Sequence, residues 1–269
     1  MPASEPAISL AAERERLALA VQEAGALALT FFRKEFKRWT KGEGDSPVTE
    51  ADIAANELLH ARLSGPGYGW LSEESENDPA RLTAPRVWVV DPIDGTRGYI
   101  AGREDWAVSV AMVEDGRPVL AALFAPATSE LFLATAGGGA TRNGAPMQVS
   151  AGNNLVEARA AGPMRRLDAL AKRIPSIQKM PRVHSLALRI ARVATGELDA
   201  TLVGPSSHDW DLAAADLLVH EAGGIVTALD GRPLIYNRPD PVHSVLAATG
   251  RERHAMLIEL MRADASELG

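Results

Sequence analysis

The sequence predicts an α+β fold in which helices and antiparallel strands occupy separate layers. Two amphipathic helix patterns come first, a series of short strands with alternating apolar residues follows, and helices and strands are mixed towards the C-terminus. The regular strand–helix period that builds a doubly wound parallel sheet is missing. The chain has 269 residues, a length that permits one large unit, and we expect two lobes within it, 1–150 and 151–269.

Composition excludes several classes of protein. The chain carries 35 acidic and 28 basic residues, a net charge of -7, which argues against a main role in gripping nucleic acid. It has no cysteine, which excludes disulfides, thiolate nucleophiles and cysteine-held metal centres. No stretch approaches a membrane span, and residues 1–10 lack a basic start. We therefore expect a cytoplasmic protein without a signal peptide and without a membrane or nucleic-acid partner.

The N-terminal segment predicts two helices. Apolar residues recur at three- and four-residue steps from about Ile8 to Trp39, and Gly25 is a candidate interruption of that first helix. Thr49, with Asp52 three residues later, is typical of a helix N-cap and predicts the start of the second helix.

The middle of the chain predicts strands. The β-rich or alternating runs are 70–71, 86–90, 107–113, 119–124 and 131–134. The first two enclose a polar loop, 72–84, and the second ends directly at Asp91. The later runs form an antiparallel meander, and Asn143-Gly144 predicts a hairpin turn.

The C-terminal part predicts mixed elements and a basic segment. The expected elements are a helix at 186–195, a strand at 200–203, a helix at 212–222, a strand at 245–248 and a final helix from Glu252. Residues 157–192 carry nine Arg or Lys and two acidic residues, a local charge of +7. This segment is either a solvated helix face or a site for an anionic ligand.

The segment 91–96 (DPIDGT) is the most informative. A strand runs into two aspartates three residues apart, Pro92 restricts the backbone between them, and Gly95 permits a tight turn. Adjacent carboxylates repel each other unless a cation lies between them, and all-oxygen ligands favour Mg²⁺ or Mn²⁺. The alternative is an Asx-type turn in which the aspartates act as caps.

Acidic residues in three further segments favour the metal site. Glu73 and Glu74 lie in the polar loop, Asp211 stands at the mouth of an apolar helix, and Asp52 lies at the start of the second helix. A solvated loop or a helix N-terminus would explain each one alone. Together, four segments bring carboxylates to the ends of elements, as a multi-metal site assembled from loops requires.

These motifs resemble the lithium-sensitive, magnesium-dependent phosphatases of the inositol monophosphatase superfamily. The matching segments, in the order of that family, are 48–52 (VTEAD), 72–75 (SEES), 88–96 (WVVDPIDGT), 210–214 (WDLAA) and 221–224 (EAGG). The resemblance spans nearly the whole chain and implies a layered α-β-α-β-α sandwich of the sugar-phosphatase type. It implies hydrolysis of a small phosphorylated metabolite, inhibition by Li⁺, and a homodimer.

The resemblance also implies roles for individual residues. The residues that would hold two or three Mg²⁺ ions, or Mn²⁺ in their place, are Glu73, Asp91, Ile93 through its carbonyl, Asp94 and Asp211. The residues that would act in catalysis are Asp52, Glu73 and Thr96, with Asp52 and Thr96 orienting and deprotonating the attacking water. The residues that would contact substrate are Asp94, Gly95, Thr96, Arg182, Ser185 and Asp211. Lys41 and Glu74 would lie behind the ligands.

The substrate is narrowed by one departure from the family pattern. Inositol monophosphatases usually place an acidic residue here to bind the hydroxyls of the sugar, but this chain has Gly204. This difference makes inositol phosphate a less favoured substrate. The basic segment 157–192 offers Arg165, Arg166 or Arg182 to a second phosphate. We therefore expect the preferred substrate to be adenosine 3′,5′-bisphosphate, which the related nucleotidases hydrolyse. Inositol 1-phosphate or another sugar phosphate is the alternative. Ala187 counts against this order, because many such nucleotidases carry a lysine there.

A different class of function is a partner-binding protein. Some relatives in the superfamily act through protein partners, including transcription machinery, and the basic segment 157–192 offers such a surface. Docking alone gives no reason to keep four metal-ligand carboxylates.

For the expected homodimer, Trp106, Phe124 and Phe132 are candidate interface residues, although each also suits a core. We expect His208 to lie at the surface or behind the ligands, because no histidine pair has metal-binding spacing.

Overall fold

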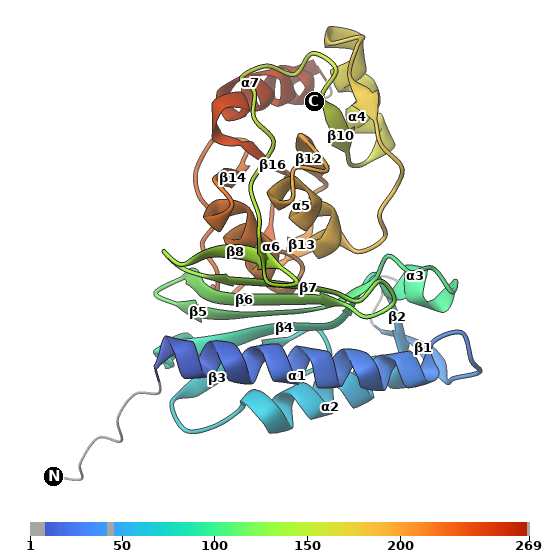
Figure 1. Ribbon diagram of the computed structural model, residues 1–269, viewed down its shortest axis with the longest axis vertical. Helices are drawn as coiled ribbons and strands as arrows, with labels where there is room; N and C mark the ends of the chain where they lie inside the picture. Colours follow the sequence, from blue (N-terminus) through green and yellow to red (C-terminus); the bar gives the residue numbers. More distant parts are fainter. Residues whose placement is uncertain (1–8, 42–45, 268–269) are drawn as a thin grey trace, which may run out of the picture.

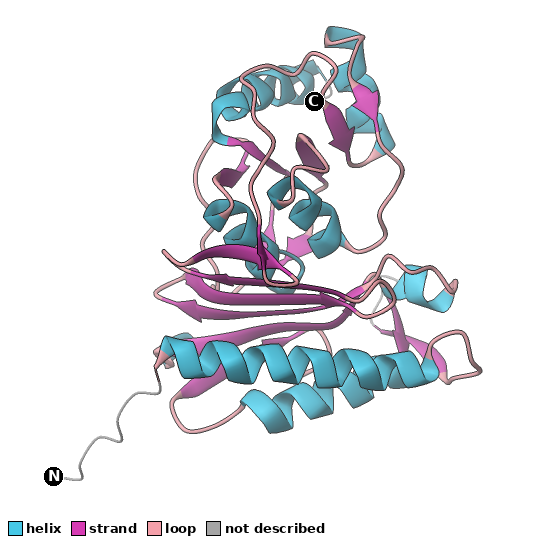
Figure 2. Ribbon diagram, viewed as in Figure 1, coloured by secondary structure: helices cyan, strands magenta, loops and turns pink. Residues whose placement is uncertain are grey.

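The computed structural model describes residues 9–41 and 46–267, which stack into five alternating layers (Figure 1). The helical layers, from one end of the molecule to the other, are α1 (Leu10–Phe31) with α2 (Glu50–Leu63), α5 (Leu186–Ala194) with α6 (Asp209–Glu221), and α4 (Met164–Arg173) with α7 (Arg251–Glu267). A sheet separates each helical layer from the next (Figure 2). The predicted α-β-α-β-α sandwich is confirmed.

The first sheet has the strand order β3-β4-β5-β6-β7-β8-β9, with β3 parallel to β4 and the other pairs antiparallel. Its strands are β3 (Tyr68–Ser72), β4 (Arg86–Asp94), β5 (Ala107–Glu114), β6 (Arg117–Ala125), β7 (Glu130–Thr135), β8 (Gly139–Arg142) and β9 (Ala145–Pro146). The predicted meander corresponds to β5, β6 and β7.

The second sheet has the order β11-β10-β12-β16-β14. Its strands are β10 (Arg159–Ala161), β11 (Gln178–Lys179), β12 (Ala200–Val203), β14 (Gly224–Ala228) and β16 (Leu246–Gly250). Two small pairs flank the layers, namely β1 (Arg38–Lys41) with β2 (Ser46–Thr49) and β13 (Ser207–His208) with β15 (Val242–His243). The short helices are α3 (Thr96–Ile100) and the 3₁₀ helix η1 (Pro79–Thr83).

Strand β4 shows how the layers share one sheet. Trp88 and Val90 pack with α1 and α2, whereas Val87 and Val89 pack in the cluster that contains α5 and α6. Side chains alternate between the two faces of a strand, so a strand that is apolar at every position is buried on both faces. This burial holds the start of the 91–96 segment in the centre of the molecule.

The first helix is shorter than predicted. It ends at Phe31, because Arg33 adopts a left-handed conformation with φ of 58°, and the chain then forms β1. Gly25 does not interrupt the helix. A Cβ atom there would lie 2.5 Å from Cδ1 of Phe124, so Gly25 instead lets α1 approach β6 closely.

Two boundaries near the acidic residues also differ from the prediction. Strand β4 does not end at Asp91 but continues to Asp94, and α6 begins at Asp209 and not at Leu212. In both elements an aspartate accepts a hydrogen bond from a nearby backbone N–H: Asp91 from Ile93 in β4, and Asp211 from His208 at the start of α6. Helices α4 and η1 were not predicted, because their sequences are polar and short.

Two of the three aromatic interface candidates are not free to meet a partner. Trp106 and Phe132 are 0% exposed and belong to the core, and Phe124 packs partly buried against α1. The homodimer therefore stays a prediction without those anchors. The lobes 1–150 and 151–269 also stay a prediction, since α5 and α6 pack between the two sheets. Within the described ranges, no helix has both the length and the apolar character needed to cross a membrane.

Candidate metal centre and active site

The carboxylates of Asp91 and Asp94 stand at an irregularity in β4. Asp91 lies opposite Ser109 of β5, and the register shifts before Asp94, which lies opposite Ala107. The Ile93 N–H donates to Asp91 Oδ1 at 3.0 Å, which holds that carboxylate against the strand. The extra residue in β4 brings both carboxylates to one side of the strand end.

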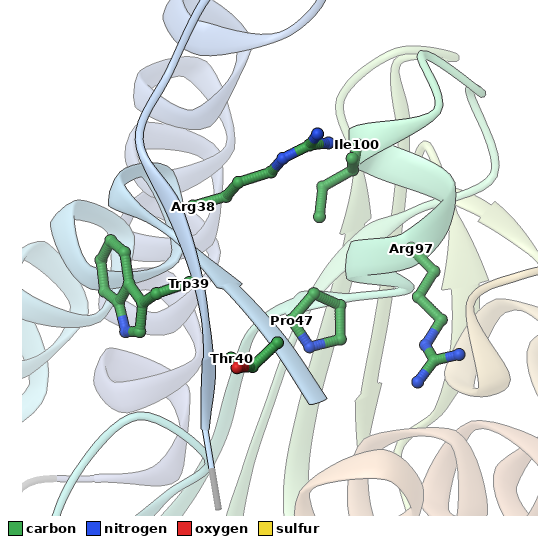
Figure 3. A pocket seen from close by; sticks show the side chains of 6 residues that line it. All are labelled: Arg38, Trp39, Thr40, Pro47, Arg97 and Ile100. Carbon is green, nitrogen blue, oxygen red and sulfur yellow. The ribbon is translucent and has the colours of Figure 1, made fainter. Parts of the chain in front are cut away.

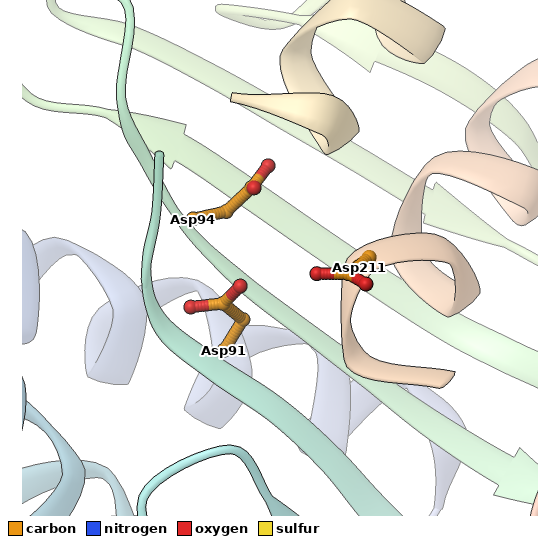
Figure 4. A group of neighbouring side chains, drawn as sticks. All are labelled: Asp91, Asp94 and Asp211. Atoms are coloured by element: carbon orange, nitrogen blue, oxygen red, sulfur yellow. The ribbon is translucent and has the colours of Figure 1, made fainter. Parts of the chain in front are cut away.

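Asp211 faces these two residues from the start of α6. It occupies the third position of the helix, where its Oδ2 accepts the His208 N–H at 2.6 Å. Figure 4 shows Asp91, Asp94 and Asp211 close together, with the Asp91 and Asp211 carboxylates directed towards the space between the three residues and the Asp94 carboxylate turned away from the other two. One oxygen from each lies within 4.8 Å of the others. Ligand oxygens lie about 2.0–2.6 Å from Mg²⁺ or Ca²⁺, so this spacing suits a shared hard cation.

Glu73 and Glu74 approach the same space from the loop after β3. The Glu73 N–H donates to the Val90 carbonyl at 3.1 Å, which ties the loop to β4. Lys41 donates to the Glu73 carbonyl, and its Nζ lies 3.4 Å from Glu74 Oε2. A cavity of about 460 Å³ opens here, and its lining includes Lys41, Glu73 and Asp211.

Asp52 and Thr96 meet beside the cluster. The Thr49 N–H donates to Asp52 Oδ2 at 2.8 Å, which completes the predicted capping box of α2. The Thr96 hydroxyl lies 3.0 Å from the Ile93 carbonyl and 3.4 Å from Asp52 Oδ1. The Ile93 carbonyl, an expected ligand, therefore shares a hydrogen-bond network with the two expected catalytic groups.

Burial raises the pKa of every carboxyl group in the cluster. It raises the pKa of Asp52 to about 7 and, together with repulsion from Asp211, the pKa of Glu73 to about 8. Burial, and then Asp94, raise the pKa of Asp211 to about 7, and the pKa values of Asp91 and Asp94 are also raised, mainly by burial. Such a group of desolvated, mutually repelling oxygens is the donor set that a hard divalent cation fits.

The start of α5 closes the cluster on the side of Asp94. The Asp94 carboxylate accepts the Ser185 hydroxyl at 2.5 Å, the Leu186 N–H at 3.1 Å and the Ala187 N–H at 2.6 Å. Gly95 adopts φ of 95°, and a Cβ atom there would lie 2.9 Å from the Ser185 nitrogen. Glycine at this position permits both the turn and the close approach of α5.

Of the expected anion-binding residues, Arg182 is exposed in the segment before α5. Arg189, on α5, is another member of the basic segment 157–192. Its Nε is buried without a hydrogen-bond partner among the described residues, and its guanidinium interacts with Asp94 and, unfavourably, with Arg182. The four-residue spacing from Ser185, one helical turn, is the signal that could have identified it.

His208 and Trp210 form part of the cavity wall. Their rings stack with centroids 4.4 Å apart and planes 4° from parallel, and both line the cavity with Glu73 and Asp211. His208 thus lies beside the cluster. The segment between β12 and β13 contains Gly204, at the position where inositol monophosphatases usually have an acidic residue.

A larger cavity lies elsewhere and has a different character. It has a volume of about 660 Å³ between the β1–β2 hairpin and α3 (Figure 3). It is lined by Arg38, Trp39, Thr40, Pro47, Arg97 and Ile100. Among the described residues, this lining contains two arginines and no carboxylate.

The chain matches known proteins over most of its length. The inositol monophosphatase family matches residues 12–265. The inositol-1-monophosphatase of Mesorhizobium japonicum is 36% identical over 203 residues, which cover 71% of this chain and 75% of that protein. The 3′-phosphoadenosine 5′-phosphate phosphatase of Mycobacterium bovis is 36% identical over 211 residues, which cover 76% and 75%.

Solved structures agree with this assignment. The inositol monophosphatase from Anabaena (Nostoc) has a TM-score of 0.75 and 26% identity, with 94% of this chain and 96% of that chain covered. The fold, the family matches and the carboxylate cluster agree with one another. This chain is a phosphoric monoester hydrolase that belongs to the inositol monophosphatase family.

Proposed function

We propose that this chain is a Mg²⁺-dependent phosphomonoesterase that prefers adenosine 3′,5′-bisphosphate, with inositol 1-phosphate or another sugar phosphate as the alternative. The observation that carries the reaction class is the convergence of Asp91, Asp94 and Asp211 within 4.8 Å. A phosphate monoester cannot enter a group of buried carboxylates unless cations neutralise them.

The chain's own residues have distinct parts in this reaction. Asp91, Asp94, Asp211 and Glu73 would hold the ions, and bound Mg²⁺ supplies the positive charge that polarises the phosphoryl group and favours deprotonation of water. Asp52 accepts the proton of the attacking water, a role for which its Oδ1, 3.4 Å from the Thr96 hydroxyl beside the metal ligands, is placed. The Thr96 hydroxyl, within reach of Asp52, orients that water.

The preference for a second phosphate is supported by Arg189. A buried guanidinium nitrogen without a partner is costly, and a phosphate oxygen would satisfy it with a charge-assisted hydrogen bond. Burial and then repulsion from Arg182 lower the pKa of Arg189, so Arg182 lies close enough to add a second cation on the exposed side. The name of the mycobacterial relative, a 3′-phosphoadenosine 5′-phosphate phosphatase, favours the same substrate class.

The deciding measurement is the ratio of kcat/KM for adenosine 3′,5′-bisphosphate to that for inositol 1-phosphate. We expect a ratio above one in the parent and a fall in Arg189→Met, with a smaller fall in Arg182→Ala. Arg232→Met removes the same charge from a side chain that is 86% exposed and serves as the matched control. A parental ratio below one reverses the substrate order, and an unchanged ratio in Arg189→Met removes that residue from recognition of the second phosphate.

A second measurement separates the enzyme from a partner-binding protein. Phosphate release from a panel of phosphomonoesters is expected with Mg²⁺, to a lesser extent with Mn²⁺, and not with EDTA. Li⁺ is expected to inhibit. Inertness across the panel in the presence of Mg²⁺ would contradict the proposed activity and favour a role in docking.

A further inference from the structure

Arg81 is a buried arginine that joins two segments far apart in the sequence. It lies in η1, in the loop that follows β3, and is 2% exposed. Its Nε donates to Asn77 Oδ1 at 2.7 Å, and its Nη1 donates to Asn237 Oδ1 at 2.5 Å across a separation of 156 residues. The Asn237 side-chain amide donates back to the Arg81 carbonyl at 3.2 Å. Arg81 and Asn237 therefore each donate a hydrogen bond to the other.

The same bonds continue to the first turn of α6. The Asn237 N–H donates to Asp209 Oδ2 at 2.7 Å, and the other oxygen of Asp209 lies 2.6 Å from His243 Nε2. Asp209 is fully buried and precedes Asp211 by two residues. The residues that form this Arg81 network are Asn77, Arg81, Asp209 and Asn237.

At its other end the Arg81 network contacts β3, the strand that precedes Glu73. A Cβ atom on Gly69 of β3 would lie 3.0 Å from the Arg81 Cα, so η1 packs directly on that strand. Strand β3 ends at Ser72, and Glu73 is the next residue. The network thus connects the segment that carries Glu73 with the helical turn that carries Asp211.

We propose that the Arg81 network positions Glu73 against Asp211 and thereby sets the affinity of the site for Mg²⁺. The two groups come from different layers of the sandwich and repel each other in the ionised form that binds Mg²⁺, which favours separation of the segments that carry them. Buried hydrogen bonds between those segments oppose the separation. Asn77 lines the same cavity as Glu73 and Asp211, which places the network at the wall of the site.

Arg81 is in this view a positioning residue and does not touch substrate. The inference rests on the proposed Mg²⁺-dependent function and deepens it. Residues that orient metal ligands typically change metal affinity by about 10–100-fold when they are replaced. A purely structural arginine would change thermal stability and leave the affinity for Mg²⁺ unaltered.

The test uses two buried arginines as a matched pair. Arg81→Lys keeps the charge but loses the planar fork that reaches Asn77 and Asn237 together. Arg253→Lys makes the same change in α7, where Arg253 is 7% exposed and donates to the Ser150 carbonyl at 2.8 Å. Titration calorimetry of the chelator-treated proteins with Mg²⁺ gives Kd, and thermal unfolding without metal gives Tm.

We expect both variants to unfold at a lower temperature than the parent. Only Arg81→Lys is expected to raise the Kd for Mg²⁺, by about 10–100-fold. Its kcat is expected to recover at saturating Mg²⁺, because the ligands themselves are intact. Equal Kd values for Arg81→Lys and the parent would overturn the proposal.

A second pair applies if Arg81→Lys does not fold. Asn237 and Asn143 both adopt left-handed backbone, with φ of 57° and 50°, and glycine tolerates that conformation. Asn237→Gly removes the side-chain arm of the network, whereas Asn143→Gly removes side-chain bonds from the β8–β9 hairpin. We expect a weaker Mg²⁺ Kd in Asn237→Gly alone, and equal Kd values in both variants would also overturn the proposal.

The two levels of the proposal fail separately. Absence of Mg²⁺ binding in the parent would contradict the proposed function and, with it, this inference. Binding in the parent that is unchanged in Arg81→Lys or Asn237→Gly would contradict the role of the Arg81 network alone.

Discussion

The hydroxyl of Ser185 donates to the carboxylate of Asp94 at 2.5 Å, across a separation of 91 residues. With the Leu186 and Ala187 N–H groups, it gives this buried carboxylate three donors from the start of α5. These bonds oppose the effect of burial on the pKa of Asp94 and favour its charged form. They also fix the middle helical layer to the end of β4.

Replacing Ser185 tests this connection. Ser185→Ala is expected to lower the free energy of unfolding by about 1.5–3 kcal/mol, because a buried carboxylate loses a hydroxyl donor. Ser185→Thr keeps the hydroxyl and is expected to restore most of the loss. Urea denaturation of the three proteins measures the effect, and an unchanged midpoint in Ser185→Ala would show that the bond contributes nothing.

Gly95 tests the close approach of α5. Gly95→Ala is expected to cost more than the roughly 1–2 kcal/mol of left-handed strain, because its Cβ would also meet the Ser185 backbone at 2.9 Å. Gly67→Ala is the control, since Gly67 has φ of 84° and no atom within 4 Å of an added Cβ. Denaturant unfolding compares the two. Equal losses of stability would mean that the contact with Ser185 has no energetic weight.

Asp91 tests the metal cluster. Asp91→Asn is expected to lower kcat/KM by at least about 1,000-fold at saturating Mg²⁺, because a carboxylate expected to serve both ions is lost. Asp216 is also a buried aspartate, but it lies on α6 and outside the cluster. Asp216→Asn is therefore the control and is expected to keep activity close to that of the parent. Near-parental turnover in Asp91→Asn would exclude the assigned role.

The pH dependence of stability follows from the raised pKa values. Glu73 has a pKa of about 8, and Asp52 and Asp211 have pKa values of about 7. In the unfolded chain these groups titrate near pH 4, roughly their ordinary values. The folded, metal-free protein therefore binds more protons than the unfolded chain between about pH 4 and pH 8. This contribution to stability is complete below about pH 4 and is lost as the pH rises to about 8.

Thermal unfolding in EDTA should accordingly show a falling Tm from pH 5 to pH 8, roughly the range in which these acids lose their protons. Mg²⁺ should reverse most of that fall, because cations replace the protons. Asp211→Asn has no proton to lose at that position and should give a shallower slope. A Tm in EDTA that rises over the same range would contradict the raised pKa values.

Local signals in the sequence predicted several elements correctly. The Thr49–Asp52 pair forms its capping box, and Asn143-Gly144 forms the β8–β9 turn with φ values of 50° and 80°. The alternating runs became β5, β6 and β7. Such features depend on bonds between residues a few positions apart or on neighbouring strands, so spacing in the sequence carries the necessary information.

Other features depend on packing and escaped prediction. The sequence around Trp106 has no feature that distinguishes a core residue from an interface residue. In the structure Trp106 is completely buried. The continuation of β4 past Asp91 follows from pairing with β5, which adds a bulge that spacing alone does not reveal. Arg189 and Arg182 look alike in a basic segment, and only the position of α5 directs Arg189 towards Asp94.

The sequence by itself determined the family of this protein, its layered α+β fold and the carboxylates from which a metal site could be built. Only the tertiary structure decided how those carboxylates meet and which residues hold them there. The Asp94–Ser185 and Arg81–Asn237 bonds join residues 91 and 156 positions apart. Such contacts arise because the buried faces of separate layers must pack and satisfy their polar groups together, and no local spacing in the chain encodes that outcome.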